Sequence, residues 1–335
     1  KNIIPNQQDT TLAKSFHQLT LQYIKLEDYK NAQFYNQKSL TQLVETPDSS
    51  LFIFVTNYSG IIYLKLNELD SAIHVYGELI KYIGDNPNYS KYTIGAYGNR
   101  SLCYGRKDLS HKALDDLITA LEVAKKHNQK KYIGILYGSL AMIFHGQEEY
   151  EKAIEYHFEA IEVKRELNNQ HSLAISYENL AISFSKVKKY NHAFEYFEKS
   201  SKIFKSVDDQ VGLALCNFYT SKTYHQLYEQ NYVANINEGF ENNSQSFIDS
   251  ALLLNRKSFD QLKAIENIFY IAEVQIEYAK VLISAKRYNH AESILKQLIP
   301  ELKGKYSSKE SNVTKQLYEI NKIKNNYSKA LKWHE

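Results

Sequence analysis

Residues 150–200 read YEKAIEYHFEAIEVKRELNNQHSLAISYENLAISFSKVKKYNHAFEYFEKS, and the opening of this stretch returns in altered form near its end. Aligning the two copies places Ala153 over Ala193, a step of 40 residues. Self-similarity at a fixed step of this size is the signature of a chain built from stacked repeats. Taken backwards from Ala153, nearly the same step leads to three further alanines, Ala113, Ala72 and Ala32.

A second set of positions recurs with the same period. Twelve residues before each of these alanines stands a mostly small residue, and three residues later comes an aromatic one. Two antiparallel helices approach closely only where no long side chain separates their backbones. We therefore predict that each unit is a hairpin of two helices that cross at the small positions. The pairs in the first helices are Thr20 and Tyr23, Gly60 and Tyr63, Ser101 and Tyr104, Ala141 and Phe144, and Ala181 and Phe184.

The spacing of apolar residues within a unit is typical of a helix. Leu136, Leu140, Ile143 and Phe144 repeat every three or four residues, and alternation with a period of two is missing. Only 12 glycines and 4 prolines interrupt the 335 residues, which suits long helices joined by short turns. The composition predicts an all-α protein.

These units resemble the tetratricopeptide repeat family, whose pattern of large, small and aromatic positions they match. The repeat of that family has about 34 residues, so the step here resembles the extended repeats of bacterial peptide-sensing regulators and kinesin light chains. His157 and Ser200 depart from the pattern, because they stand where an aromatic and an alanine are usual. The matching residues are Tyr137, Leu140, Ala141, Phe144, Ala153 and Ala160 in one unit, and Tyr177, Leu180, Ala181, Phe184, Ala193 and Phe197 in the next.

The resemblance implies an α-solenoid, a right-handed superhelix of about eight hairpins. We expect residues 1–11 to form a leader and residues 12–335 a single repeat domain. An Asn-rich stretch, residues 229–243, is predicted to be an irregular insertion whose carboxylates are solvated. The last hairpin stops at ALKWHE within its second helix. Because a terminal repeat needs a polar cap, we expect the natural chain to continue beyond Glu335.

Composition and charge exclude several classes of protein. With 43% hydrophobic and 24% charged residues the chain is not of the disordered type. A net charge of +3 without a dense Lys/Arg run argues against nucleic-acid binding by this segment. The longest apolar stretch, residues 133–144, is too short to span a bilayer. Cys103 and Cys216 are expected to be buried thiols. The compartment stays open: extracytoplasmic in a membrane-bound sensor, otherwise cytoplasmic.

No motif of catalysis is present. The sequence lacks a Gly-rich phosphate loop, G-x-S-x-G, H-E-x-x-H and C-x-x-C. Its 11 histidines are scattered along the chain and do not cluster as metal ligands do. We therefore expect no enzymatic activity, no metal and no cofactor.

The resemblance implies a concave groove, lined by the first helix of each hairpin, that holds peptides or partner helices. Several residues that the register places there are basic, which suits an extended peptide with acidic side chains or a free C-terminal carboxylate. Glycines also recur on these helices, at 95, 98, 134 and 138, and we favour close helix packing over a nearby ligand as their reason. The candidate groove residues are Asn57, Lys65, Arg106, His145, Glu178, Lys186, Lys222, His225 and Lys280.

Three functions are compatible with these features. The first is the sensor or interaction segment of a larger bacterial signalling or transcription-regulatory protein, which binds a protein or peptide. The second is a stand-alone adaptor for the assembly of protein complexes. The third is an enzyme of the regulator-phosphatase kind, which has the least support because only about eleven residues precede the first repeat and the N-terminal catalytic bundle of such proteins needs more. The oligomeric state is not predicted.

Overall fold

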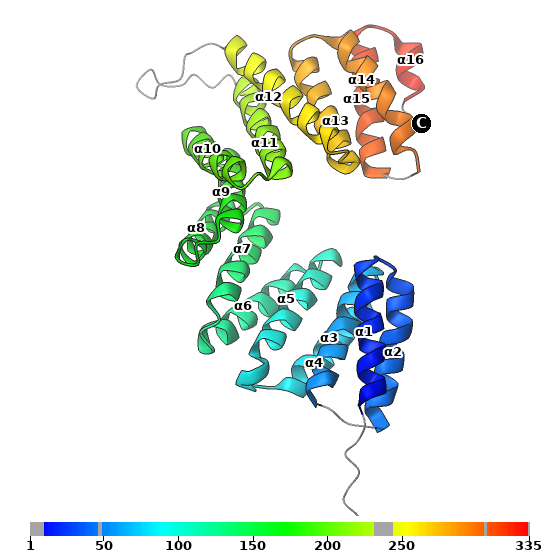
Figure 1. Cartoon of the computed structure of the whole chain (residues 1–335). Helices are drawn as coiled ribbons and strands as arrows, with labels where there is room; N and C mark the ends of the chain where they lie inside the picture. The colour runs from blue at the N-terminus through cyan, green and yellow to red at the C-terminus, as the bar shows by residue number, and fades with distance from the viewer. Residues whose placement is uncertain (1–9, 46–48, 231–243, 305–306, 334–335) are drawn as a thin grey trace, which may run out of the picture. The chain divides into compact units, whose positions relative to one another are not determined.

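The computed structural model describes residues 10–45, 49–230, 244–304 and 307–333 (Figure 1). These residues form sixteen α-helices and one short 3-10 helix, and no strand occurs within these ranges. The chain divides into two compact units, Lys1–Leu167 and Asn168–Glu335. The prediction of an all-α protein is confirmed.

The first unit consists of four helical hairpins. In each hairpin two consecutive helices pack against each other, and each hairpin packs against the next. A 3-10 turn, Pro87–Tyr89, precedes the third hairpin. The helices are α1 (Thr11–Lys25), α2 (Tyr29–Glu45), α3 (Ser49–Lys65), α4 (Leu69–Ile83), α5 (Ser90–Arg106), α6 (Ser110–Lys126), α7 (Lys130–Gly146) and α8 (Tyr150–Glu166).

The second unit repeats this arrangement with four more hairpins. Its first helices are α9, α11, α13 and α15, and neighbouring first helices contact one another. The last helix is short, as the sequence indicated. The helices are α9 (Gln170–Lys186), α10 (Tyr190–Ser206), α11 (Gln210–Glu229), α12 (Ser244–Ala264), α13 (Ile268–Ser284), α14 (Tyr288–Leu302), α15 (Ser307–Ile323) and α16 (Tyr327–Leu331).

The small positions lie where the helices of a hairpin cross. Ala153 and Ala193 are fully buried, and so are the other three alanines of the series. A β-carbon added at Gly60 would collide with the ring of Tyr76, which fills the space left by the glycine. The predicted register is therefore confirmed, because only small residues fit between the paired backbones.

Most of the described turns within and between hairpins share one geometry. At Lys188 the backbone has φ of 62°, in the left-handed region, and the following Lys189 N–H donates to the Phe184 carbonyl over 2.9 Å. Glu148 and Glu149 repeat this geometry with Phe144 one step earlier. Such a left-handed residue ends a helix by satisfying its last carbonyl groups. The constant step of the repeat thus includes the turn.

Close packing explains only part of the glycine pattern. A β-carbon at Gly134 would lie 3.1 Å from the Val163 side chain, so this glycine does permit close helix packing. At Gly138 the nearest atom would be the Lys164 ammonium at 3.6 Å, an ordinary contact. Gly95 and Gly98 have nothing within 4 Å of that position. The packing interpretation is therefore wrong for Gly95 and Gly98.

Several expectations concern the margins of the described ranges. α1 begins at Thr11, and residues 1–9 of the predicted leader lie outside the described residues. Most of the predicted insertion, residues 231–243, also lies outside them. Cys103 and Cys216 are both buried free thiols. In the described ranges, no helix has the length and apolar character needed to cross a membrane.

Candidate binding pocket between α11 and α13

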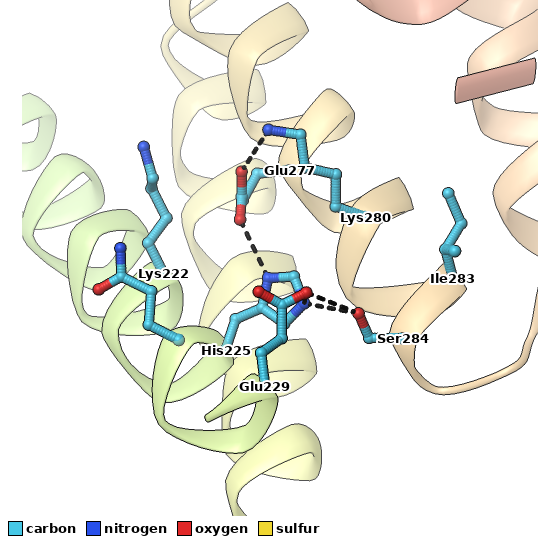
Figure 2. A pocket seen from close by; sticks show the side chains of 8 residues that line it. Lys222, His225, Glu229, Glu277, Lys280, Ile283 and Ser284 are labelled. Atoms are coloured by element: carbon cyan, nitrogen blue, oxygen red, sulfur yellow. Dashed lines mark hydrogen bonds and ion pairs between the residues drawn. The ribbon is translucent and has the colours of Figure 1, made fainter. Parts of the chain in front are cut away.

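The second unit contains a pocket of about 350 Å³ between two neighbouring first helices (Figure 2). Such a volume lies at the lower end of the range of small-ligand sites. The walls carry charged and polar side chains, with one aliphatic residue among them. Lining residues are Lys222, His225, Gln226 and Glu229 from α11 and Glu277, Lys280, Ile283 and Ser284 from α13.

Helical spacing brings these side chains to one place. On α11, Lys222, His225 and Glu229 follow at intervals of three and four residues, and such positions share one face of a helix. On α13, Glu277, Lys280 and Ser284 follow with the same intervals. Since α11 and α13 contact each other, their two polar faces meet.

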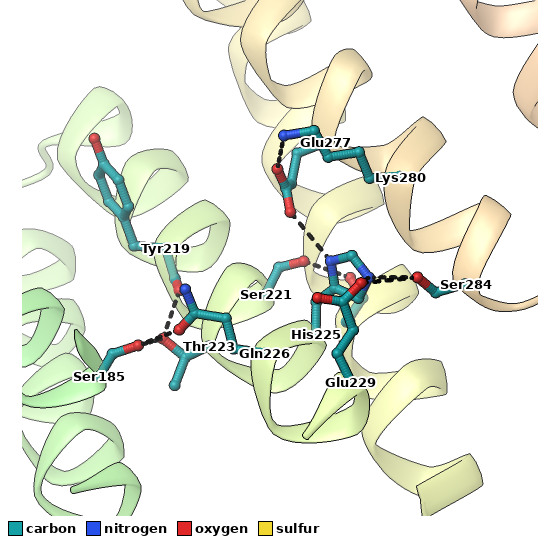
Figure 3. Close-up of polar contacts among 11 residues, drawn as sticks. Ser185, Tyr219, Ser221, Thr223, His225, Gln226, Glu229, Glu277, Lys280 and Ser284 are labelled. Atoms are coloured by element: carbon teal, nitrogen blue, oxygen red, sulfur yellow. Dashed lines mark hydrogen bonds and ion pairs between the residues drawn. The ribbon is translucent and has the colours of Figure 1, made fainter. Parts of the chain in front are cut away.

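His225 is the centre of the polar network (Figure 3). Its side chain is only 6% exposed, and its Nδ1 lies 3.2 Å from Glu277 Oε1. Its Nε2 lies 2.9 Å from Ser284 Oγ and 3.3 Å from Glu229 Oε1. The Ser284 hydroxyl in turn donates to Glu229 Oε1 over 3.2 Å. The imidazole is therefore fixed on both sides by groups of two helices.

Glu277 is a buried carboxylate, with a side chain 9% exposed. Burial by itself would raise its pKa, but the hydrogen bond from His225 and the positive charges of Lys280 and Lys222 outweigh burial and lower the pKa to about 2. Lys280 Nζ donates to Glu277 Oε2 over 3.2 Å. Glu277 is thus ionised at neutral pH. Because an ionised carboxylate only accepts hydrogen bonds, His225 carries a hydrogen on Nδ1.

Lys222 contributes a positive charge that the described part of the chain does not neutralise by direct contact. Its ammonium makes no hydrogen bond or ion pair with a described residue, and lies 5.4 Å and 5.8 Å from the ring centres of Phe218 and Tyr219. Aromatic faces attract a cation weakly at an exposed site. The ammonium keeps its three N–H donors for a ligand.

A second group of polar contacts supports the pocket from the side of α9. Ser185 donates to Gln226 Oε1 over 2.6 Å, and the Thr223 hydroxyl donates to Ser185 Oγ over 3.3 Å (Figure 3). Tyr228 donates to the Ser284 carbonyl over 3.3 Å, which ties α11 to the end of α13. These contacts fix the helix that carries Lys222, His225 and Glu229.

The structure thus brings three of the predicted groove residues, Lys222, His225 and Lys280, into one pocket. Lys186 is exposed at the end of α9. Glu178, also on α9, is only 7% exposed, and its Oε1 has no hydrogen-bond partner within the described part of the chain. Burial, with a smaller contribution from the charge of Asp209, raises the pKa of Glu178 to about 8. Glu178 therefore lies in the interior and not on a solvated wall.

The other four candidates belong to the first unit. Lys65 and Arg106 are exposed at the ends of α3 and α5, and Arg106 Nη1 donates to the Leu64 carbonyl over 3.5 Å. Asn57 on α3 is half-buried. His145 on α7 is half-buried too, with its ring edge-on to Tyr150 at 5.1 Å between centres. The Arg106 guanidinium therefore reaches the end of α3, the helix whose last residue is Lys65.

The three partners of His225 in the polar network were not among the candidates from the sequence. Glu229 was expected to be solvated in an insertion, but it is the last residue of α11 and is paired with His225 and Ser284. The repeat register that selected the groove candidates also places Ser284 on the groove side of its helix, so this residue could have been predicted from the sequence. Glu277 is one residue away from a position that the register places on the groove side, so the sequence offered no reason to select it.

Ser284, His225 and Glu277 have the order of a nucleophile, a base and a carboxylate in a hydrolase. Acyl transfer also requires N–H donors for the oxyanion. The two N–H groups after Ser284 are already used, since Ala285 donates to Val281 and Lys286 to Ile283, both over 2.9 Å. Among the described residues no group of three metal-ligating side chains is placed to hold an ion. The arrangement presents fixed charges, which suits binding.

Comparison with known proteins assigns the repeat. Residues 132–206, which span parts of α7 to α10, match the family model of the tetratricopeptide repeat. These residues are tetratricopeptide repeats. Helical hairpins also lie on both sides of the matched stretch, and those on its N-terminal side keep nearly the same step and the same buried alanines, so the hairpin architecture extends beyond the matched residues. A comparison with curated protein sequences found no match.

Solved structures with the same fold include bacterial and archaeal regulators. The apo form of the quorum sensor NprR from B. thuringiensis has a TM-score of 0.67 at 17% identity, over 97% of this chain and 86% of that one. Apo RapI has a TM-score of 0.64 at 16% identity, over 85% of this chain and 99% of that one. A signal transduction ATPase with a tetratricopeptide repeat sensor, from Pyrococcus horikoshii, has a TM-score of 0.67 at 14% identity, over 96% of this chain. This chain spans 47% of the length of that ATPase. These likenesses show the fold.

Proposed function

We propose that this tetratricopeptide repeat scaffold binds a protein or peptide and serves as the sensor or interaction segment of a larger bacterial signalling or transcription-regulatory protein. The observation that carries the proposal is the pocket between α11 and α13, where Lys222 and Lys280 meet the buried pair His225 and Glu277. A fold shared with a quorum sensor and with the sensor region of a signalling ATPase agrees with this role.

The charges on the first helices favour an acidic partner. Lys65, Arg106 and Lys186 are exposed and each ends a first helix, and Lys222 has no anionic contact partner among the described residues. A carboxylate that meets such a group forms a charge-assisted hydrogen bond, which is shorter and stronger than a neutral one. An acidic side chain or a free C-terminal carboxylate would supply that group.

A titration tests this function. The probe is a fluorescent eight-residue peptide rich in Asp and Glu with a free C-terminus, and anisotropy reports its binding. We expect Lys186→Glu and Lys222→Glu together, on the neighbouring first helices α9 and α11 of the second unit, to weaken binding at least tenfold at low salt, with an unchanged circular dichroism spectrum. Lys202→Glu is the control, because Lys202 is an exposed lysine of the second helix α10. Equal affinity of wild type and the double variant would refute the acidic groove.

The stand-alone adaptor is the alternative, and one observation favours it. The chain forms two compact units, each with its own set of first helices. An adaptor would bind two partners at once, whereas a sensor segment would respond to one. Charge reversal at Arg106 alone and at Lys186 alone separates the two functions. An adaptor loses a different partner in each variant, and a sensor segment loses its partner in one variant only.

A further inference from the structure

We infer that the pocket between α11 and α13 binds a short free peptide, about two or three residues long, by both of its charged ends. This inference rests on the proposed function and names the ligand class of that site. The ligand carboxylate would meet Lys222 and Lys280, and the ligand ammonium would meet Glu229.

The pocket has opposite charges at its two ends (Figure 2). The ammonium groups of Lys222 and Lys280 lie at one end together with the buried Glu277 carboxylate, which Lys280 contacts and Lys222 attracts without a direct bond, so that end keeps an excess positive charge. Glu229 lies at the other end, with a side chain 56% exposed. A ligand with an anionic and a cationic end can use both ends of the pocket, whereas a purely anionic ligand uses only the two lysines.

Both ends retain capacity for a ligand. Lys222 spends none of its N–H donors on a described residue, and Lys280 makes one ion pair, to Glu277. At Glu229 the contacts with His225 and Ser284 both use Oε1, so Oε2 is left for an ammonium group. His225 and Glu277 are held by hydrogen bonds before any ligand arrives. Such preorganisation reduces the cost of ordering on binding.

The separation of Lys222 and Glu229 along α11 sets the length expected of the ligand. Lys222 and Glu229 are seven residues apart on α11, which is about 10 Å along the helix axis. An extended peptide spans roughly 3.5 Å per residue, so its two ends are about 7 Å apart in a dipeptide and about 10 Å apart in a tripeptide. A free amino acid is too short to meet both charges. A long peptide brings only one of its ends to a pocket of about 350 Å³.

Calorimetric titration of the whole chain with trialanine, which has both ends free, tests the inference. We expect binding that falls about tenfold when either the amino end is acetylated or the carboxyl end is amidated, since each change removes one charge-assisted contact. Lys222→Met should reduce the sensitivity to amidation, because only Lys280 then meets the ligand carboxylate, and leave the sensitivity to acetylation unchanged. Glu229→Gln should do the reverse. Lys202→Met and Glu198→Gln, an exposed pair on α10, are the matched controls.

The outcomes separate this inference from the proposed function. If trialanine and both of its blocked forms bind equally, or if Lys222→Met and Glu229→Gln behave as the controls do, the inference is wrong. If the acidic eight-residue peptide binds but trialanine does not, the inference is wrong and the proposed function stands. If neither binds, both are wrong. The inference is supported if Lys222→Met responds less than wild type to amidation of the peptide and Glu229→Gln responds less than wild type to its acetylation.

Discussion

Replacing Glu178 by Gln should stabilise the second unit at neutral and alkaline pH and remove a part of its pH dependence. Glu178 is buried on α9, its Oε1 accepts no hydrogen bond from any residue that the structure describes, and burial raises its pKa from 4.5 to about 8. The side chain is therefore a neutral acid in the folded protein at pH 7. Glutamine has nearly the same shape and stays neutral at every pH.

The magnitude follows from proton linkage. Between pH 4.5 and pH 8 the unfolded chain has released the proton of Glu178 while the folded chain keeps it, so the free energy of unfolding falls as pH rises. Below pH 4.5 both states hold the proton, and above pH 8 both have lost it. A difference of about 3.5 pKa units at about 1.4 kcal/mol each corresponds to about 5 kcal/mol as an upper limit. The gain from the variant should grow over this range and then become constant.

Urea unfolding of wild type and variant at pH 5, 6, 7, 8 and 9, followed by circular dichroism, measures the effect. Glu198→Gln is the control, because Glu198 is exposed on α10 and should change the pH dependence little. The expected result is a difference in unfolding free energy between Glu178→Gln and wild type that is small at pH 5 and reaches several kcal/mol at pH 8. Parallel pH profiles would show that Glu178 ionises normally and would refute the reasoning.

Three further changes test the fold and the pocket. Ala153→Leu should lower the unfolding free energy by roughly 1–3 kcal/mol by overpacking a helix crossing, and an unchanged melting temperature would mean that the register is wrong. Lys188→Gly should raise stability by about 1 kcal/mol, because glycine relieves the left-handed backbone with φ of 62°; a loss of stability in urea would contradict this. Glu277→Gln should lower the unfolding free energy by roughly 3 kcal/mol at pH 7, because it leaves His225 and Lys280 without their buried anion. This loss should shrink below pH 4.5. There the wild-type carboxyl takes up a proton in the unfolded chain but not in the folded one, where its pKa is about 2, so the wild type itself loses stability.

The hairpins could be predicted because their requirements are local. A small residue at a helix crossing and a left-handed residue at the following turn recur at each step of the repeat, and each acts through neighbours in the same hairpin. Ala153, Ala193 and Gly60 were therefore assigned correctly from the sequence alone. The glycines at 95 and 98 were not, since nothing in the spacing tells whether a neighbouring side chain reaches them.

The pocket could be predicted only in part. Register placed Lys222, His225 and Lys280 on first helices, which is where they lie. Their meeting depends on the contact between α11 and α13, whose residues His225 and Glu277 are 52 positions apart in the chain. Glu178 was expected on the open wall for the same register reason, but the packing around α9 buries it.

By itself the sequence determined that the protein is helical, that its helices pair into hairpins, and where each pair crosses, because helical period and side-chain size express themselves within about forty residues. Only the tertiary structure decided which charges are buried, which are paired and which are free. That outcome depends on how neighbouring hairpins exclude water from Glu277 and Glu178 and leave Lys222 without a bonded partner among the described residues. Desolvation and pairing are properties of the packed neighbourhood and have no local pattern in the chain.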